Sequence, residues 1–225
     1  MKEVTIESWT TKNPLSMIGY HAGYCYNSDI SDVEKNIKRG INCLKSGHLR
    51  VAEFPKIYLT ISGYSAKVIR EWYTHIIDTS RLQSSTRYID YSNFEYVIPP
   101  TINKNKEAKE IYENAMKDIQ NAILKLKEIG IAQENFSGLL PLNYTTKITC
   151  CLGLRELINI VNQRSCKRAY WEFQELVAEI LKQLETYSPE WKKLFELNLF
   201  VPKCEVFGYC PERKGCGRYP TKEEK

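Results

Sequence analysis

The sequence lacks any long hydrophobic run. Within its 225 residues, no window approaches the roughly 18 apolar residues that a membrane-spanning helix needs, and no apolar segment resembling a signal peptide follows Met1. We therefore expect a cytoplasmic protein. A chain of this length can bury a sizeable core, and we expect residues 1–202 to form a single catalytic domain, with residues 203–225 as a cysteine-containing tail.

The sequence also has little excess charge of either sign. Its 32 Lys and Arg residues against 27 Asp and Glu residues give a formal net charge of +5, and the basic residues are dispersed along the chain. This small, dispersed charge argues against nucleic acid as a partner. It is compatible with a small anionic ligand.

Cysteine, in contrast, is plentiful, with eight residues. Without a secretion signal, we expect a reducing compartment in which all of them remain thiols. Three of them, Cys204, Cys210 and Cys216, suggest zinc, but they are more widely spaced than the close Cys pairs of structural zinc sites, and no histidine follows His75. The sequence therefore predicts no metal site.

A polar stretch between Arg70 and Tyr88 carries three arginines, Arg70, Arg81 and Arg87, among many serines and threonines. Guanidinium groups offer forked donors that match phosphate oxygens, and hydroxyl groups can complete the shell around an anion. A phosphorylated small molecule is the ligand that this stretch predicts.

Apolar periodicity and turn residues predict several helices and a few strands. Strands are expected at 3–9, at 56–62, at 88–98 and after Pro141; helices are expected after a capping box at Ser31–Glu34, after Ser65, at 104–129, at 154–163, at 167–186 and after Ser188. These elements do not alternate as βαβ units do. They favour an α+β fold in which helices flank an antiparallel sheet.

The helix expected at 104–129 is the clearest of these elements, and Gly130 is expected to end it. Its Lys- and Glu-rich face should be solvated. The opposite face is predicted to be apolar, and it consists of Ile111, Ala115, Ile119, Ala122, Ile123, Leu126 and Ile129.

Several segments together resemble the flavin-dependent thymidylate synthases. Gly47–Glu53 resembles the His-x-x-x-x-Glu segment of that family. Trp72–Ile76 is similar to the tryptophan and central histidine of its Arg-His-Arg signature, and Ser80–Tyr88 is similar to the Ser-x-Asn-Glu-x-Ser-x-Arg-Tyr that follows. In the second half, the matching positions in the family's order are Leu140-Pro141, Arg155, Asn159, Arg164 and Ala169–Glu172.

The chain also departs from the family pattern. Thr74 and Ile76 replace the outer arginines of the signature, Leu82-Gln83 replaces its Asn-Glu pair, and Gly153 stands where an asparagine is expected. We therefore expect a divergent branch whose phosphate pocket uses other residues. Arg70 and Arg81 are the nearest arginines in the sequence that could supply the missing charge.

The resemblance implies reductive methylation of dUMP to dTMP, with FAD, NADPH and methylenetetrahydrofolate, in a homotetramer whose active sites form between subunits. The expected dUMP-binding residues are Arg70, Arg81, Gln83, Ser85, Arg87 and Arg164, of which Arg164 is also the expected catalytic residue. The expected FAD-binding residues are His48, Glu53, His75, Arg155 and Asn159. The alternatives are a flavin- or nucleotide-binding homologue with lost or altered catalysis, and a scaffold without enzymatic activity.

Overall fold

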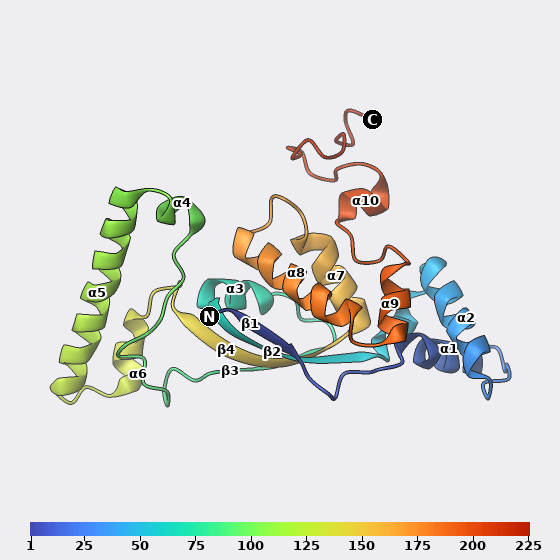
Figure 1. The fold of residues 1–225 in the computed structure, drawn as a ribbon, viewed down its shortest axis with the longest axis horizontal. Coiled ribbons are helices and arrows are strands. Elements are labelled where there is room, and N and C mark those ends of the chain that lie inside the picture. Colours follow the sequence, from blue (N-terminus) through green and yellow to red (C-terminus); the bar gives the residue numbers. More distant parts are fainter. The chain divides into compact units, whose positions relative to one another are not determined.

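Four strands form one antiparallel sheet in the order β1-β2-β4-β3 in a computed structural model that describes residues 1–225 (Figure 1). The strands are β1 (Glu3–Ile6), β2 (Lys56–Ser65), β3 (Thr79–Gln83) and β4 (Thr145–Gly153). Along β2, alternate residues are buried, as the sequence pattern predicts for a strand with one covered face. The predicted α+β fold with an antiparallel sheet is confirmed.

Ten α-helices and two short 3-10 helices complete the fold. They are α1 (Pro14–Cys25), α2 (Val33–Lys45), η1 (Leu49–Glu53), α3 (Ala66–Trp72), α4 (Pro100–Asn103), α5 (Lys106–Glu128), α6 (Gln133–Phe136), η2 (Ser137–Leu139), α7 (Leu154–Arg164), α8 (Trp171–Glu185), α9 (Pro189–Phe195) and α10 (Lys203–Phe207). None of the helices is long and apolar enough to cross a bilayer.

The chain divides into two compact units. Unit 1 consists of Met1–Glu3, Ile61–Thr74 and Leu82–Thr149, and unit 2 consists of Val4–Thr60, His75–Arg81 and Cys150–Lys225. Residues 203–225 belong to unit 2, and their predicted separation from a catalytic domain ending at residue 202 stays a prediction.

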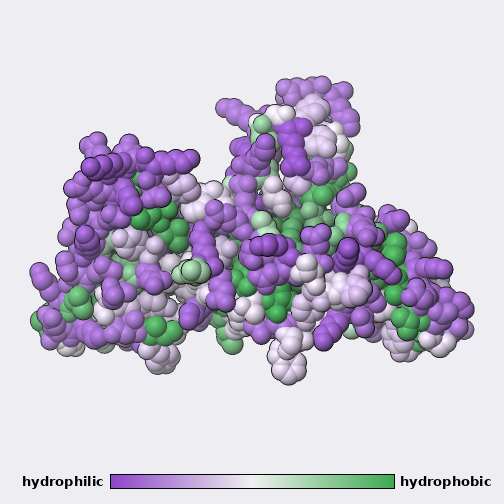
Figure 2. Space-filling model, in the orientation of Figure 1, coloured by the Kyte–Doolittle hydropathy of each residue, from purple (hydrophilic) through white to green (hydrophobic).

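In unit 1, α5 packs on a small aromatic core. Met116 and Ile123 of this helix are buried together with Phe94, Phe136 and Tyr144. The predicted helix and its end at Gly130, which has a φ of +81°, are both present. The predicted apolar face is shifted, however, because Ile111 is 64% exposed and Ile129 is 74% exposed. The outer face of α5 is mainly hydrophilic in Figure 2, in agreement with a solvated Lys- and Glu-rich surface.

In unit 2, α7, α8 and α9 enclose an apolar core, and α7 and α8 are in contact (Figure 1). Leu157, Phe173 and Trp191 are almost completely buried in this core. Ser188 caps α9 as predicted, because its Oγ accepts a hydrogen bond from the backbone N–H of Trp191.

Helix α1 has no counterpart among the predicted elements. Its N-cap residue, Asn13, makes no side-chain capping hydrogen bond, but Pro14 occupies the first helical position, which is a common start signal. The helix lies very close to α2, because a Cβ atom at Gly19 or Gly40 would overlap the backbone of the facing helix. The sequence therefore contained a local start signal that the predicted elements did not use, and packing against α2 adds to it.

Three further sequence predictions need correction. Strand β3 lies in the polar stretch between Arg70 and Tyr88, where no strand was predicted, and it pairs with β4 at the sheet edge. At 88–98, only an isolated bridge between Tyr96 and Tyr144 replaces the expected strand. The cap of α2 is Asp32 rather than Ser31, because the Asp32 carboxylate accepts the hydrogen bond from Lys35 N.

Candidate functional site

A buried histidine in unit 2 lies near residues from both the first turn and the last turn of α7. His75 is only 5% exposed, and its Nε2 atom accepts a hydrogen bond from Arg164 Nε at 3.0 Å. The Nδ1 atom of the ring lies 3.6 Å from Oε1 of Glu156. Glu156 is in the first turn of α7 and Arg164 is its last residue, so one helix supplies both partners.

The partners of His75 determine where its proton lies. Arg164 donates to Nε2, so a neutral ring must carry its hydrogen on Nδ1, facing Glu156. Burial, followed by the positive charges of Arg164 and Arg81, lowers the pKa of His75 to about 4. His75 is therefore neutral near pH 7 and acts as an acceptor for Arg164.

Glu156 is the second buried titratable group of this cluster. Burial raises the pKa of its carboxyl group, since a carboxylate there loses its water shell. Its Oε2 accepts a hydrogen bond from Asn159 Nδ2 at 3.2 Å, whereas its Oε1 is buried without a hydrogen-bond partner. Sequence reasoning missed this residue. The available signal was an acidic side chain within the apolar run that begins α7.

The Arg164 guanidinium has a defined orientation. Besides its hydrogen bond to His75, its central carbon lies 4.8 Å from the centre of the Phe173 ring, a cation–π contact. The edge of the His75 ring also packs against Phe173, at 5.9 Å between ring centres. A guanidinium held in this way has a fixed direction in which to meet an anionic or polar ligand.

A second ion pair joins α7 to the 3-10 helix η1. Arg155 Nη1 lies 2.5 Å from Glu53 Oε1, and both side chains are partly exposed. Asn159 follows Arg155 by four residues and therefore lies on the same side of α7. The structure thus brings Glu53 and Arg155 into contact, and their joint role in binding FAD stays a prediction.

His48 lies at the start of η1 and is exposed. It lines a cavity of about 360 Å³ that also contains His21 and Phe54, whose rings stack at 3.7 Å. Neither of these two aromatic residues was among the predicted site residues. A lone histidine and a lone phenylalanine give no sequence signal that they will stack.

The structure explains why position 153 is glycine. Gly153 N donates a hydrogen bond to the backbone oxygen of Asp78, and a Cβ atom at position 153 would overlap the Asp78 carboxylate. Lys56 Nζ lies 2.5 Å from the same carboxylate. Asp78 therefore fills the space that a side chain at position 153 would need.

The predicted phosphate-side residues of unit 1 are more exposed. Arg87 forms an ion pair with Glu134, with Nε and Nη2 at 3.0 and 2.9 Å from one carboxylate oxygen. Ser85 Oγ accepts a hydrogen bond from Arg87 N, and Gln83 Nε2 donates to Thr146 Oγ1. Arg70 is exposed in the last turn of α3.

Arg81, the remaining predicted residue, belongs to unit 2. Its Nη2 atom donates a hydrogen bond to Thr79 Oγ1 at 2.8 Å. Its positive charge contributes to the lowered pKa of His75 and partly offsets the rise in the pKa of Glu156 that burial causes. Arg81 therefore belongs to the electrostatic surroundings of the buried histidine.

This α+β fold presents guanidinium, imidazole and amide groups from several segments. Such a set of groups is typical of enzyme sites that bind anions. Comparison with known proteins gives the family. The model of the thymidylate synthase complementing protein family, Thy1, matches residues 7–190, and the chain belongs to this family.

Relatives named flavin-dependent thymidylate synthase match almost the whole chain. The protein of Nitratidesulfovibrio vulgaris is 32% identical over 238 residues, which cover 95% of this chain and 94% of the relative. The Pyrococcus furiosus protein is 32% identical, with coverages of 95% and 91%, and the Clostridium tetani protein is 30% identical, with coverages of 92% and 90%. The resemblance predicted from the sequence motifs is confirmed.

Proposed function

We propose that this chain catalyses the reductive methylation of dUMP to dTMP as a flavin-dependent thymidylate synthase. The observation that carries the proposal is the family match over residues 7–190. The cofactors and co-substrates are FAD, NADPH and methylenetetrahydrofolate. When bound, the flavin supplies the redox chemistry, and the protein supplies binding, orientation and electrostatics.

The donor set of unit 2 fits a flavin nucleotide. Arg155 offers a guanidinium that Glu53 orients, Asn159 lies on the same helical side, and His48 borders the neighbouring cavity. Such cationic and amide groups suit the phosphates and polar ring atoms of a dinucleotide. We assign FAD binding to these four residues together with His75.

His75 serves this site as a positioning residue. Both its ring nitrogens face protein groups, Arg164 on one side and Glu156 on the other. Since the neutral ring accepts from Arg164, it leaves the positive charge on the guanidinium and fixes its direction. Arg164 can then stabilise negative charge that develops on the pyrimidine, which is the role we assign to it as the catalytic residue.

The dUMP phosphate requires the remaining cations. We assign its binding to Arg87 with Ser85 and Gln83, supported by Arg70 and Arg81, because dUMP carries close to two negative charges that must meet cations or N–H donors. Glu134 currently balances the charge of Arg87. The phosphate would therefore replace or share this counter-ion.

The same proposal includes the assembly and location of the protein. We propose a cytoplasmic homotetramer with active sites between subunits, and a catalytic domain that ends at residue 202. Sedimentation at several protein concentrations tests the oligomeric state. A monomer that retains full activity would contradict the shared site.

A second candidate is a flavin- or nucleotide-binding homologue with lost or altered catalysis. The observation that favours it is the loss of both outer signature arginines, which are Thr74 and Ile76 here, with Ile76 73% exposed. A scaffold without flavin is the third alternative.

One set of measurements separates these candidates. The absorption spectrum of the purified protein reports flavin, a thermal shift with dUMP reports nucleotide binding, and product analysis with NADPH and methylenetetrahydrofolate reports dTMP. We expect all three to be positive. Flavin without dTMP would favour the binding homologue, and a colourless protein without a dUMP shift would favour the scaffold.

A further inference from the structure

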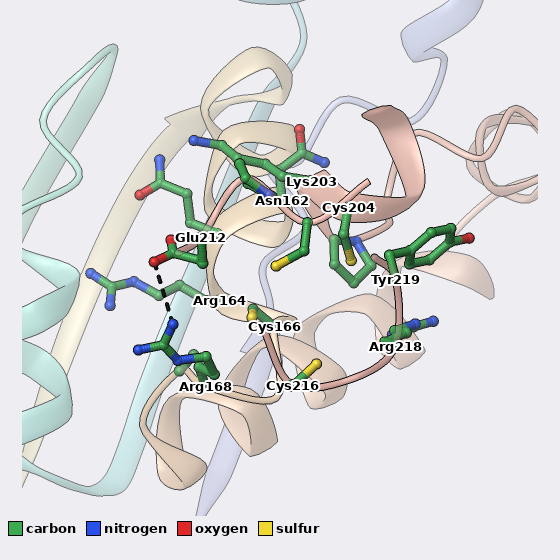
Figure 3. Close-up of a pocket in the computed structure, with 15 residues that line it drawn as sticks. Asn162, Arg164, Cys166, Arg168, Lys203, Cys204, Glu212, Cys216, Arg218 and Tyr219 are labelled. Carbon is green, nitrogen blue, oxygen red and sulfur yellow. Dashed lines mark ion pairs between the residues drawn. The ribbon is translucent and has the colours of Figure 1, made fainter. Parts of the chain in front are cut away.

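Four cysteines line one pocket of unit 2, which has a volume of about 350 Å³. Cys166 follows α7, Cys204 lies in α10, and Cys210 and Cys216 lie in the segment after it. Figure 3 shows the labelled Cys166, Cys204 and Cys216 around the same opening. The pocket thus gathers half of the cysteines of the chain from two segments that are far apart in sequence.

All four of these cysteines are free thiols. Cys204 and Cys210 are buried, at 8% and 7% exposed, and Cys216 is exposed. The sequence predicted no metal site because only three thiols, widely spaced, were apparent in residues 203–225. Cys166 adds a fourth thiol to the same pocket.

The pocket is also rich in positive charge. Arg164, Arg168, Lys203 and Arg218 contribute to its lining. Four thiolates around a divalent ion or a cluster carry net negative charge. The basic side chains that line the pocket would offset this charge.

Hydrogen bonds and ion pairs already attach the C-terminal segment to the segment after α7. Arg168 donates a hydrogen bond to the backbone oxygen of Lys214, and it forms an ion pair with Glu212 at 3.5 Å (Figure 3). Arg218 pairs with Glu205 of α10. The Arg168 contacts link the segment that carries Cys166 to the C-terminal segment, and the Arg218–Glu205 pair lies within the latter.

We propose that Cys166, Cys204, Cys210 and Cys216 form a tetrathiolate site for a thiophilic metal centre, either a zinc ion or an iron–sulfur cluster. Sets of four cysteine ligands are characteristic of these two centres. On binding, each thiol releases its proton to solvent and forms one sulfur–metal bond, with no change in the oxidation state of sulfur. The zinc ion, or the preassembled cluster, comes from outside the protein.

The thiols would have to approach one another when the metal binds. No group of three or more cysteine, histidine or acidic side chains is already closed around a metal position. The loop that carries Cys216 can supply this movement, because Gly215 and Gly217 flank it and Gly217 has a φ of +82°. A Cβ atom at Gly217 would meet nothing within 4 Å, so the loop is not enclosed there.

The proposed centre would have a structural role next to the catalytic arginine. Arg164 contributes to the wall of the pocket and also donates to His75. A metal that links Cys166 to the C-terminal segment would therefore fix the end of α7 that carries Arg164. This inference does not rest on the proposed reaction, since its main readout is metal content.

The test is elemental analysis of the full chain, expressed with added zinc and iron and purified under anaerobic conditions without chelators. We expect either about one zinc ion per chain, or about four irons with four acid-labile sulfides. These two results distinguish the two centres.

Single replacements provide the matched comparison. Cys166→Ser, Cys204→Ser, Cys210→Ser and Cys216→Ser should each lose nearly all of the metal. Cys25→Ser, at an exposed cysteine outside the pocket, should retain the metal of the parent. A Cys166→Ser protein with the metal content of the parent would overturn the four-ligand site.

A second measurement needs no variant to fold. Cd²⁺ added to the reduced, metal-stripped parent should produce thiolate-to-metal charge-transfer absorption. The absence of this band, or a parent that holds neither zinc nor iron, overturns the proposal. So does a disulfide between any two of the four cysteines, detected by mass after alkylation without reductant.

Discussion

The two arginines on which the proposed chemistry depends most, Arg164 and Arg87, are held in different ways. Arg164 in unit 2 meets a buried neutral histidine and an aromatic face. Arg87 in unit 1 has a side chain that is 63% exposed, and it is paired with the carboxylate of Glu134, which is 52% exposed. His75 and Phe173 fix the direction of the first guanidinium, whereas the second is paired with an exposed carboxylate that a phosphate must displace or share. A count of arginines in the sequence cannot distinguish these two states.

The largest expected effect follows from removing the preorganised guanidinium. Arg164→Ala should lower the rate of dTMP formation by roughly 100- to 1,000-fold, the loss typical for one donor that stabilises developing charge. Arg164→Lys keeps the charge but not the planar fork, so we expect an intermediate rate. Steady-state kinetics with saturating dUMP measures both, and an Arg164→Ala rate equal to that of the parent would contradict the assigned role.

The buried histidine should make stability depend on pH. The pKa of His75 is about 4 in the folded chain and near 6.5 when unfolded, so only the unfolded chain takes up this proton between those values. The free energy of unfolding should therefore fall by about 3 kcal/mol as the pH decreases from 6.5 to 4, with no such loss above 6.5.

The raised pKa of Glu156 acts in the opposite direction, because its folded form retains a proton that the unfolded chain loses above pH 4.5. His75→Gln isolates the histidine contribution, since the amide oxygen can still accept from Arg164 but does not titrate. Denaturant unfolding at pH 7 and pH 4 measures the difference between parent and variant. If the free energies of unfolding of the parent and of His75→Gln change with pH in parallel, His75 is not buried as a neutral group. His48→Gln, at an exposed position, serves as the control.

The next prediction concerns the ion pair between α7 and η1, which belongs to the proposed FAD site. Arg155→Ala should weaken FAD binding by about 1.5–3 kcal/mol, the range for a hydrogen bond to a charged group. Glu53→Gln retains the size of the partner and should have a smaller effect. Flavin fluorescence titration measures both affinities, and unchanged FAD binding in both Arg155→Ala and His48→Ala would remove these residues from the cofactor site.

The smallest effect is expected for the counter-ion of Arg87. Glu134→Gln removes the competing carboxylate and should strengthen dUMP binding by about 0.2–1 kcal/mol, the usual strength of an exposed ion pair. Glu113→Gln, which disrupts the pair with Lys109 on α5, is the matched control and should leave dUMP affinity unchanged. Weaker dUMP binding in Glu134→Gln would mean that the carboxylate helps to hold Arg87 in its binding position.

The sequence predicted the elements that have strong local signals. Helix α5 has apolar periodicity and a terminal glycine, and α9 begins with Ser188 and Pro189, so neighbouring residues suffice to define both. Helix α1 depends on its close approach to α2 at Gly19, and β3 depends on pairing with β4. Strand β3 is specified by this distant partner, whereas α1 also has a local start signal at Asn13 and Pro14 that the prediction did not use.

The candidate site divides in the same way. Motif order identified His75, Arg155 and Arg164, but not Glu156, which completes the surroundings of the buried histidine. The clustering of Cys166 with the later thiols was also invisible, because spacing along the chain carries no information about proximity after folding. Residue identity suggested the chemical groups, and only the fold showed which of them meet.

Because Gly153 and Asp78 are in contact, the effect of a substitution at one of these positions depends on the residue at the other. An asparagine introduced at position 153 would collide with the Asp78 carboxylate, and Asp78→Gly alone would leave Lys56 without its partner and a void beside Gly153. Each replacement is therefore unfavourable in the background of the other residue. A protein engineer who wishes to place an asparagine at position 153 therefore has to move or replace the Asp78 side chain, and with it the partner of Lys56.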